Sequence, residues 1–349
     1  MHASTKETTC RHCNHSYDNY IVARFNAFIY NIRGGWTLPE GIHSVKAYWW
    51  VQKITFSFML EMFVFVSGYL MAYQYIELKK IDKFLPFLYK KIKRLIVPGI
   101  FFSILYFIFF YSFQYVFHAT NQILIGCGHL WFLPMLFWCF IGGYFLIKVK
   151  FSEPIKLLSC LCLAVISDAL GWLPFQMGNA CYYLFFFYFG YYVFINKHQL
   201  MQFFSKSKRV ITGIIIFLCA FVTLTLLKER ILNIESASII TKAIKTCLSQ
   251  VCTLIYATLG VIMMFATVNY FLNKKLSPIS RWVVSLSPIC FGVYIYQQFI
   301  LKYLYYQTSL PILLGSYMLP IAGLTITLMT SIVLAKLSRK TRFGRFLIG

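Results

Sequence analysis

The chain has 349 residues, of which 59% are hydrophobic and 12% are charged, and 33 basic against 10 acidic residues give a net charge of +23. Soluble domains carry about 25% charged residues, so a chain of this composition would expose a large apolar surface to water. The composition excludes a soluble protein and predicts a polytopic membrane protein. Its basic residues lie mostly between apolar spans, where orientation in the membrane and anionic lipids explain them, so no nucleic-acid partner is expected.

A membrane-spanning helix needs about 20 apolar residues, and nine stretches of the chain approach or exceed that length. We therefore expect an all-α transmembrane helix bundle of about nine spans, with the fourth and fifth the shortest. The expected spans cover residues 48–73, 92–117, 130–147, 155–170, 181–195, 210–227, 246–272, 283–306 and 313–337.

The connections between these spans alternate in charge. Residues 119–128, 171–180 and 307–311 contain no Lys or Arg. Short basic loops mark the cytoplasmic side, so we expect a cytoplasmic C-terminal end. The loop 228–245 is an exception, because it is basic although the alternation places it on the other side. The basic connections are 79–94, 148–156, 197–209, 274–281 and 336–345.

This topology places residues 1–47 outside the cytoplasm, although they contain no signal peptide. An exported segment of this kind would normally follow one more helix, so we expect a tenth span that would precede Met1 in an intact chain. The predicted organisation is an extracytoplasmic segment 1–47, a transmembrane domain 48–337 and a basic cytoplasmic tail 338–349.

Glu61 lies midway along the first expected span. A carboxylate at the bilayer centre costs about 3 kcal/mol on insertion scales, so it should face the protein interior. The spacing i, i+4, i+7 places Glu61, Phe65 and Gly68 on one helix face. The alternative to a functional role is a buried carboxyl that only packs, beside a glycine that allows close helix approach.

Seven basic residues lie between Lys79 and Pro98. Anionic lipid headgroups attract such residues, and they explain Lys79, Lys80 and Lys83 as an orientation signal. Lys91 and Arg94 lie one turn apart with Lys90 beside them. They enter a span in which Pro98 removes a backbone donor and frees the Arg94 carbonyl. Paired cations at a kinked helix mouth suit the phosphates of a nucleotide-like donor.

Three further segments carry candidate residues. His129 and Trp131 open the third span and precede Pro134, a residue that breaks helices. The segment is expected either to bend inward around a site or to form a simple interfacial belt. Tyr294 and Gln297 lie in an aromatic span with two adjacent amides, which otherwise serve as contacts between helices. The cluster from Cys10 to His15 lacks the spacing of a structural zinc site, so no metal is expected.

Five segments, taken in order, resemble the acyltransferase family 3 membrane proteins, which O-acylate cell-surface and secreted glycans in bacteria. The resemblance implies a bundle of about ten helices in the bacterial cytoplasmic (inner) membrane, an acyl-CoA donor on the cytoplasmic side and a glycan acceptor near the outer face. The segments are FVFVSGYL (63–70), KKIKRLIVP (90–98), GHLWFLP (128–134), YYLFFFYFGYYV (182–193) and SPICFGVYIYQQF (287–299).

The family also carries an Arg and a His in its first helix, and His2 stands where that His would fall if the helix began upstream of Met1. The resemblance then implies that His2, with Glu61 and His129, performs catalysis. Lys90, Lys91 and Arg94 would bind the phosphates of acetyl-CoA. The family often has a His where Gln297 stands, which places an acid–base role there in doubt. The expected acceptor contacts are Ser67, Trp131, Tyr294 and Gln297.

The predicted function is therefore an integral membrane O-acyltransferase that moves an acetyl group to a glycan or glycolipid hydroxyl. A transporter or glycan flippase would also contain aromatic helices and a buried Glu61, although no internal repeat with broken helices is visible. A third hypothesis is that the protein is a truncated, inactive family member. The sequence leaves open the acceptor, the acyl group and the oligomeric state.

Overall fold

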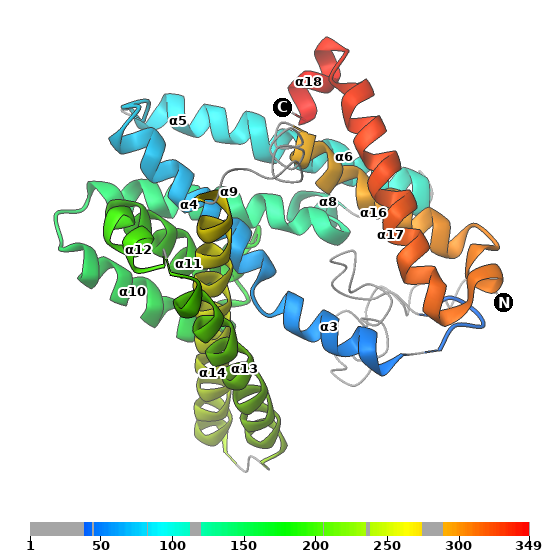
Figure 1. Cartoon of the computed structure of the whole chain (residues 1–349). Helices are drawn as coiled ribbons and strands as arrows, with labels where there is room; N and C mark the ends of the chain where they lie inside the picture. Colours follow the sequence, from blue (N-terminus) through cyan, green and yellow to red (C-terminus); the bar gives the residue numbers. More distant parts are fainter. Residues whose placement is uncertain are drawn as a thin grey trace. The chain divides into compact units, whose positions relative to one another are not determined.

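The computed structural model describes residues 38–43, 45–81, 83–111, 120–204, 206–234, 238–273 and 289–348. Every regular element in these ranges is a helix (Figure 1). The expectation of an all-α fold is confirmed. His2 and the cluster from Cys10 to His15 lie outside the described residues.

Six helices in the described part of the chain are long and apolar enough to cross a membrane, which confirms a multi-pass membrane protein. The count of nine spans stays a prediction, because α10 (Glu153–Val165) has 13 residues and α16 (Cys290–Tyr306) has 17. The six candidates are Lys46–Ile76, Phe84–Phe110, Gly128–Lys148, Ser207–Asn233, Ile239–Tyr270 and Leu310–Ser338.

The chain divides into two compact units, which are described separately. Unit 1 combines residues of 1–56 with those of 288–349, and unit 2 is formed by residues 57–287. Unit 1 contains α3 (Lys46–Phe56), α16, α17 (Leu310–Ser338) and α18 (Arg342–Ile348). Unit 2 contains α4 (Met59–Ile76), α5 (Phe84–Lys91), η3 (Ile92–Ile96), α6 (Val97–Phe110), α8 (Thr120–Ile125), η4 (Gly128–Trp131), α9 (Phe132–Lys148), α10, η5 (Ser167–Leu170), α11 (Met177–Ile195), α12 (Lys197–Phe203), α13 (Ser207–Asn233) and α14 (Ile239–Asn273).

Helix α11 is the centre of unit 2 and packs against α4, α9 and α10. Its sequence is aromatic on every side, as expected for a helix buried all round. Phe186, Phe187 and Tyr188 are each at most 1% exposed, and Phe65 of α4 is buried against this helix. Large buried aromatic side chains therefore fill the space around α11, between it and α4, α9 and α10.

Two glycines allow the backbones of α4 and α11 to touch. A Cβ at Gly68 would collide with the carbonyl oxygen of Phe187, and a Cβ at Gly190 would collide with the carbonyl oxygen of Phe65. Small residues permit this kind of close helix approach in membranes. The suggestion from sequence that Gly68 allows close packing is confirmed, and Gly190 is its counterpart on α11.

We expect Gly190→Ala to lower the free energy of unfolding by about 1–3 kcal/mol, the range for overpacking a close-packed core. The added methyl group meets backbone atoms, which cannot rotate away as a side chain would. Thermal unfolding of the purified protein in detergent measures the effect. Gly213→Ala on α13 is the matched control, because a Cβ there meets nothing within 4 Å. This control should be neutral or stabilising, since alanine favours a helix.

Helices α13 and α14 form a long hairpin that packs side by side (Figure 1). Phe217 of α13 contacts Phe58, and Gly260 of α14 leaves room for the same Phe58 ring. The Nζ atom of Lys228 donates a hydrogen bond to Thr253 Oγ1 at 2.7 Å. Lys228, the first cation of the basic segment 228–245, therefore bonds across these two helices.

Unit 1 is built from α16 and α17, and residues before α3 are attached to it. Helix α17 is interrupted at Gly315, whose φ of 61° and ψ of −176° leave the helical region. Directly after the break, Ser316 accepts a hydrogen bond from the backbone N–H of His43 at 2.9 Å. Ile42 packs in a cluster with Leu301 and Leu319. The segment before α3 is thus anchored at the broken helix.

Candidate functional site

The buried carboxylate Glu61 lies in the first turn of α4 and is 2% exposed. Its Oε1 atom accepts a hydrogen bond from the hydroxyl of Tyr182 on α11 at 3.3 Å. Phe65 and Gly68 are buried on the same face, which confirms the face expected from the spacing. Glu61 therefore faces the interior of unit 2, where a tyrosine hydroxyl is directed toward it.

A tight turn presents His129 at the start of η4. Gly126 and Gly128 have φ angles of +90° and +55°, which side chains with a Cβ rarely adopt. A Cβ at Gly126 would lie 2.6 Å from the carbonyl carbon of Leu130. The N–H of Cys127 donates to Ser103 Oγ of α6 at 3.2 Å and fixes the turn. This arrangement places His129, which is 7% exposed, inside the unit.

Pro134 does not break the helix that it was expected to break. It is the third residue of α9, which continues from Phe132 to Lys148. A proline in the first turn costs little, because the N–H that it lacks has no acceptor within the helix. The irregular backbone falls before it, in the 3-10 turn η4, which passes directly into α9.

Aromatic rings connect Trp131 with the carboxylate. The Trp131 ring lies 6.1 Å from that of Tyr183, and the rings of Tyr183 and Tyr182 are 4.9 Å apart at 88°. Since the Tyr182 hydroxyl bonds to Glu61, the structure brings α4, η4 and α11 together at one place. We call Glu61, Trp131, Tyr182 and Tyr183 the carboxylate cluster, and the buried His129 lies on the same turn η4 as Trp131. Sequence analysis missed both tyrosines, because an aromatic residue in an aromatic helix is usually core.

Ser67 is a neighbour of this face but has a local partner. Its hydroxyl donates to the Phe63 carbonyl one turn earlier in α4, at 2.9 Å. Serines commonly bond to the i−4 carbonyl in this way inside apolar helices. The acceptor contact expected of Ser67 stays a prediction.

The basic run leads into the membrane span through a π-helix. Helix α5 passes into η3, five residues that include Lys93 and Arg94, and Pro98 follows in the first turn of α6. Single π turns are rare and occur often at functional sites. The kink expected at this proline thus takes the form of a π turn just before it. Lys90 and Arg94 are exposed in this segment.

Lys91 lies against aromatic rings at the start of the π turn. Its Nζ atom is 3.3 Å from the centroid of the Phe140 ring and 5.4 Å from that of Phe87. A cation over a ring face is stabilised by the ring quadrupole. Among the described residues, no carboxylate forms an ion pair with Lys91.

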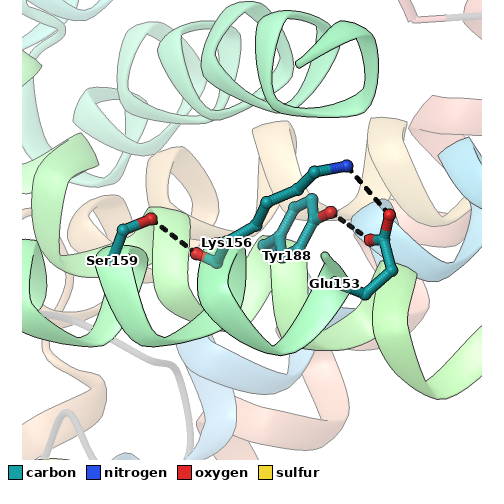
Figure 2. A network of polar contacts seen from close by, with 4 residues as sticks. All are labelled: Glu153, Lys156, Ser159 and Tyr188. Carbon is teal, nitrogen blue, oxygen red and sulfur yellow. Dashed lines mark hydrogen bonds and ion pairs between the residues drawn. The ribbon is translucent and has the colours of Figure 1, made fainter. Parts of the chain in front are cut away.

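Lys156 differs from Lys91, because it is buried in an ion pair. Its predicted place in a basic connection was wrong. Lys156 lies inside α10, and its side chain is 4% exposed. Its Nζ atom forms an ion pair with Glu153 at 2.8 Å, and the hydroxyl of the buried Tyr188 donates to the other carboxylate oxygen (Figure 2). Ser159 bonds to the Lys156 carbonyl at 2.7 Å. A buried ammonium paired with a carboxylate that also accepts a hydrogen bond from a tyrosine hydroxyl is structural in character.

Tyr294 and Gln297 lie on α16 of unit 1. Both are partly exposed, whereas the neighbouring Gln298 is 2% exposed. Of the two adjacent amides, the one buried in the helix packing is therefore Gln298. The adjacent Tyr296 hydroxyl lies 2.7 Å from Ser338 Oγ on α17, which joins the two helices of this unit.

The part of the chain that the structure describes holds no group of three or more His, Cys, Asp and Glu side chains that could bind a metal ion. The first place described above contains the buried carboxyl of Glu61 and the Tyr182 hydroxyl, with the buried His129 on the adjoining turn η4. The second contains cations that lie near or on aromatic rings.

The helices and these side chains define a multi-pass membrane protein with a polar cluster inside its helices and a cation-rich helix entrance. A family model described as an acyltransferase domain matches residues 26–336. The chain belongs to this family, acyltransferase family 3, and the resemblance inferred from five motifs is confirmed. Comparisons with curated proteins and with solved structures gave no match.

Proposed function

We propose that the protein transfers an acetyl group from acetyl-CoA to a hydroxyl of a cell-surface or exported glycan, in the bacterial inner membrane. Membership of the acyltransferase family supports acyl transfer in general. The donor, the acceptor and the orientation are our proposal, in which the side carrying Lys90 and Arg94 faces the cytoplasm, where coenzyme A is made.

The cations around the π turn are the observation that supports this proposal most directly. Arg94 offers a planar fork that matches phosphate geometry, and Lys91 adds a point charge on the same side of the helix one turn earlier. Lipid headgroups explain exposed lysines, but they do not require a lysine held over Phe140 at 3.3 Å. A diphosphate bound here would leave the acyl arm free to extend along the helices.

The transfer requires one proton movement and one bond exchange. The acceptor oxygen attacks the thioester carbonyl carbon, the carbon–sulfur bond breaks, and the sulfur leaves as the thiol of coenzyme A once protonated. We assign removal of the hydroxyl proton to His2, while Glu61 and His129 orient the acceptor or relay the proton. Apolar helices around the reacting atoms exclude water, which would otherwise hydrolyse the thioester.

The test uses membranes that contain the full chain, labelled acetyl-CoA and a panel of bacterial glycans. Label in the glycan that disappears on mild alkaline treatment supports O-acetylation. Failure to transfer label and failure to bind coenzyme A would together overturn the proposal. Flux of glycan across the vesicle membrane without any dependence on coenzyme A would show instead that the protein is a transporter or flippase.

Lys91→Gln and Arg94→Gln should each weaken coenzyme A binding about tenfold or more, because each removes a charge-assisted contact to a phosphate. The Kd of the purified protein for coenzyme A measures the loss. The control is Lys83→Gln, which removes one exposed positive charge at the start of the same helix. Equal weakening by all three variants would point to a general attraction of anions and contradict a defined site.

A further inference from the structure

Four lysines at one end of the described part of unit 2 fall into two kinds, those in an ion pair and those in contact with aromatic rings alone. Lys148 ends α9, and its ring contact with Tyr75 places it beside the end of α4, near the entrances of α5 and α10. We call this side the basic end. Lys156 and Lys197 form ion pairs there, with Glu153 and Glu77 respectively. Lys91 and Lys148 form none with any carboxylate in the described ranges, and both lie on aromatic rings instead.

A stack of two rings separates the two unpaired lysines. Phe87 of α5 and Tyr144 of α9 lie 5.3 Å apart with an interplanar angle of 26°. Lys91 is 5.4 Å from the Phe87 ring, and Lys148 is 5.8 Å from the Tyr144 ring. The two ammonium groups are thus placed on the two members of one stack, at neighbouring helices.

The stacked rings of Phe87 and Tyr144 are not accessible to a ligand, so the adenine base of a nucleotide cannot stack on them. Phe87 is 6% exposed and Tyr144 is 8% exposed, so both rings are held by the surrounding helices. Lys148 itself is exposed, and its Nζ atom is also 5.5 Å from the Tyr75 ring of α4. Contacts with two rings restrict where this ammonium lies before any ligand binds, which reduces the entropy lost on binding.

A ligand that uses both lysines must carry two separate anionic groups. Coenzyme A has this pattern, because its diphosphate and its ribose 3′-phosphate are attached at different positions of one nucleoside. The diphosphate matches the pair Lys91 and Arg94, since two cations and an arginine fork suit two linked phosphates. Lys148, which is exposed and lies near two aromatic rings, is then placed to meet the monoester phosphate.

We propose that Lys148 binds the ribose 3′-phosphate of the coenzyme A donor and so selects coenzyme A over carriers that lack this phosphate. The inference rests on the proposed acetyl-CoA donor and adds a specificity-determining residue to that site. Tyr75 and Tyr144 are positioning residues that hold the Lys148 ammonium. Acyl groups carried on a bare phosphopantetheine arm, which has no ribose, would lack this contact.

The experiment compares the Kd of coenzyme A with that of 3′-dephospho-coenzyme A for the purified full chain in detergent. The unsubstituted protein should bind coenzyme A about tenfold more tightly, the difference expected for one charge-assisted contact near a surface. Lys148→Gln should weaken coenzyme A to the level of the dephospho form and leave binding of the dephospho form unchanged. Lys148→Arg should keep most of the preference.

Lys197→Gln is the matched control, because Lys197 also lies over an aromatic ring, 4.2 Å from Phe194, but is already paired with Glu77. It should keep the full preference for coenzyme A. If Lys148→Gln weakens both ligands equally, or neither, Lys148 does not read the 3′-phosphate and this inference is wrong while the donor proposal stands. If the unsubstituted protein binds neither ligand, the donor proposal itself is overturned.

Discussion

Replacing Glu153 by alanine should lower the free energy of unfolding by about 1–3 kcal/mol, between the costs of breaking an exposed and a fully buried ion pair, because the Glu153 side chain is 33% exposed. The substitution leaves the ammonium of Lys156, whose side chain is 4% exposed, without its carboxylate. It also removes the acceptor of the Tyr188 hydroxyl on α11 (Figure 2). Thermal unfolding in detergent, or proteolysis during brief exposure to denaturant, measures the loss.

The double variant Glu153→Gln with Lys156→Met separates charge from packing. It removes both charges, keeps an amide oxygen for the Tyr188 hydroxyl, and replaces the lysine stem with an apolar side chain of similar length. Replacing a buried pair as a whole is often nearly neutral, so the double variant should recover most of the stability. Ser159→Ala should change it by no more than about 0.5 kcal/mol, because this hydroxyl bonds to a carbonyl of its own helix. A single Glu153→Ala variant as stable as the parent would show that Lys156 finds another way to be solvated.

The helical fold was predictable because it follows from composition and from the length of apolar runs. The burial of Glu61 followed from the same physics, since a carboxylate inside an apolar membrane helix has to face the protein interior. The other residues on the same helix face are then buried as well. Gly68 belongs to that face, and its role in close packing could be inferred from the sequence. These predictions depend on one helix at a time.

The partners of those residues were not predictable, because they come from other helices. Nothing in the local sequence indicates that the Tyr182 hydroxyl reaches Glu61, since the two are far apart in the chain. Lys156 followed the charge pattern of a loop, yet an i, i+3 carboxylate and a tyrosine from α11 allow it to be buried. The π turn before Pro98 depends on how α6 packs, so the proline predicted an irregularity without specifying its form.

Glu61→Gln should lower kcat for acyl transfer by about 10²-fold or more, within the range for loss of a group that moves or directs a proton. Glutamine has nearly the same shape and keeps an oxygen that can accept from the Tyr182 hydroxyl, but it has no exchangeable carboxyl proton and no charge. Acetyl transfer from labelled acetyl-CoA, at saturating donor, gives kcat. The Kd for coenzyme A should not change, since the proposed donor contacts are on α5, η3 and α9.

The variant Tyr182→Phe separates the effect of the Glu61 carboxyl on kcat from the effect of the side chains around it. It removes the hydroxyl that donates to Glu61 but keeps the ring, which packs on Tyr183 at 4.9 Å. The expected loss is about tenfold at most, because a neutral hydrogen bond contributes roughly 0.5–1.5 kcal/mol. If Glu61 only fills space, Glu61→Gln should retain activity close to that of the parent. A large loss of kcat with Gln at position 61, a small one with Phe at position 182, and unchanged binding of coenzyme A would together show that the carboxyl of Glu61 orients the acceptor or relays the proton.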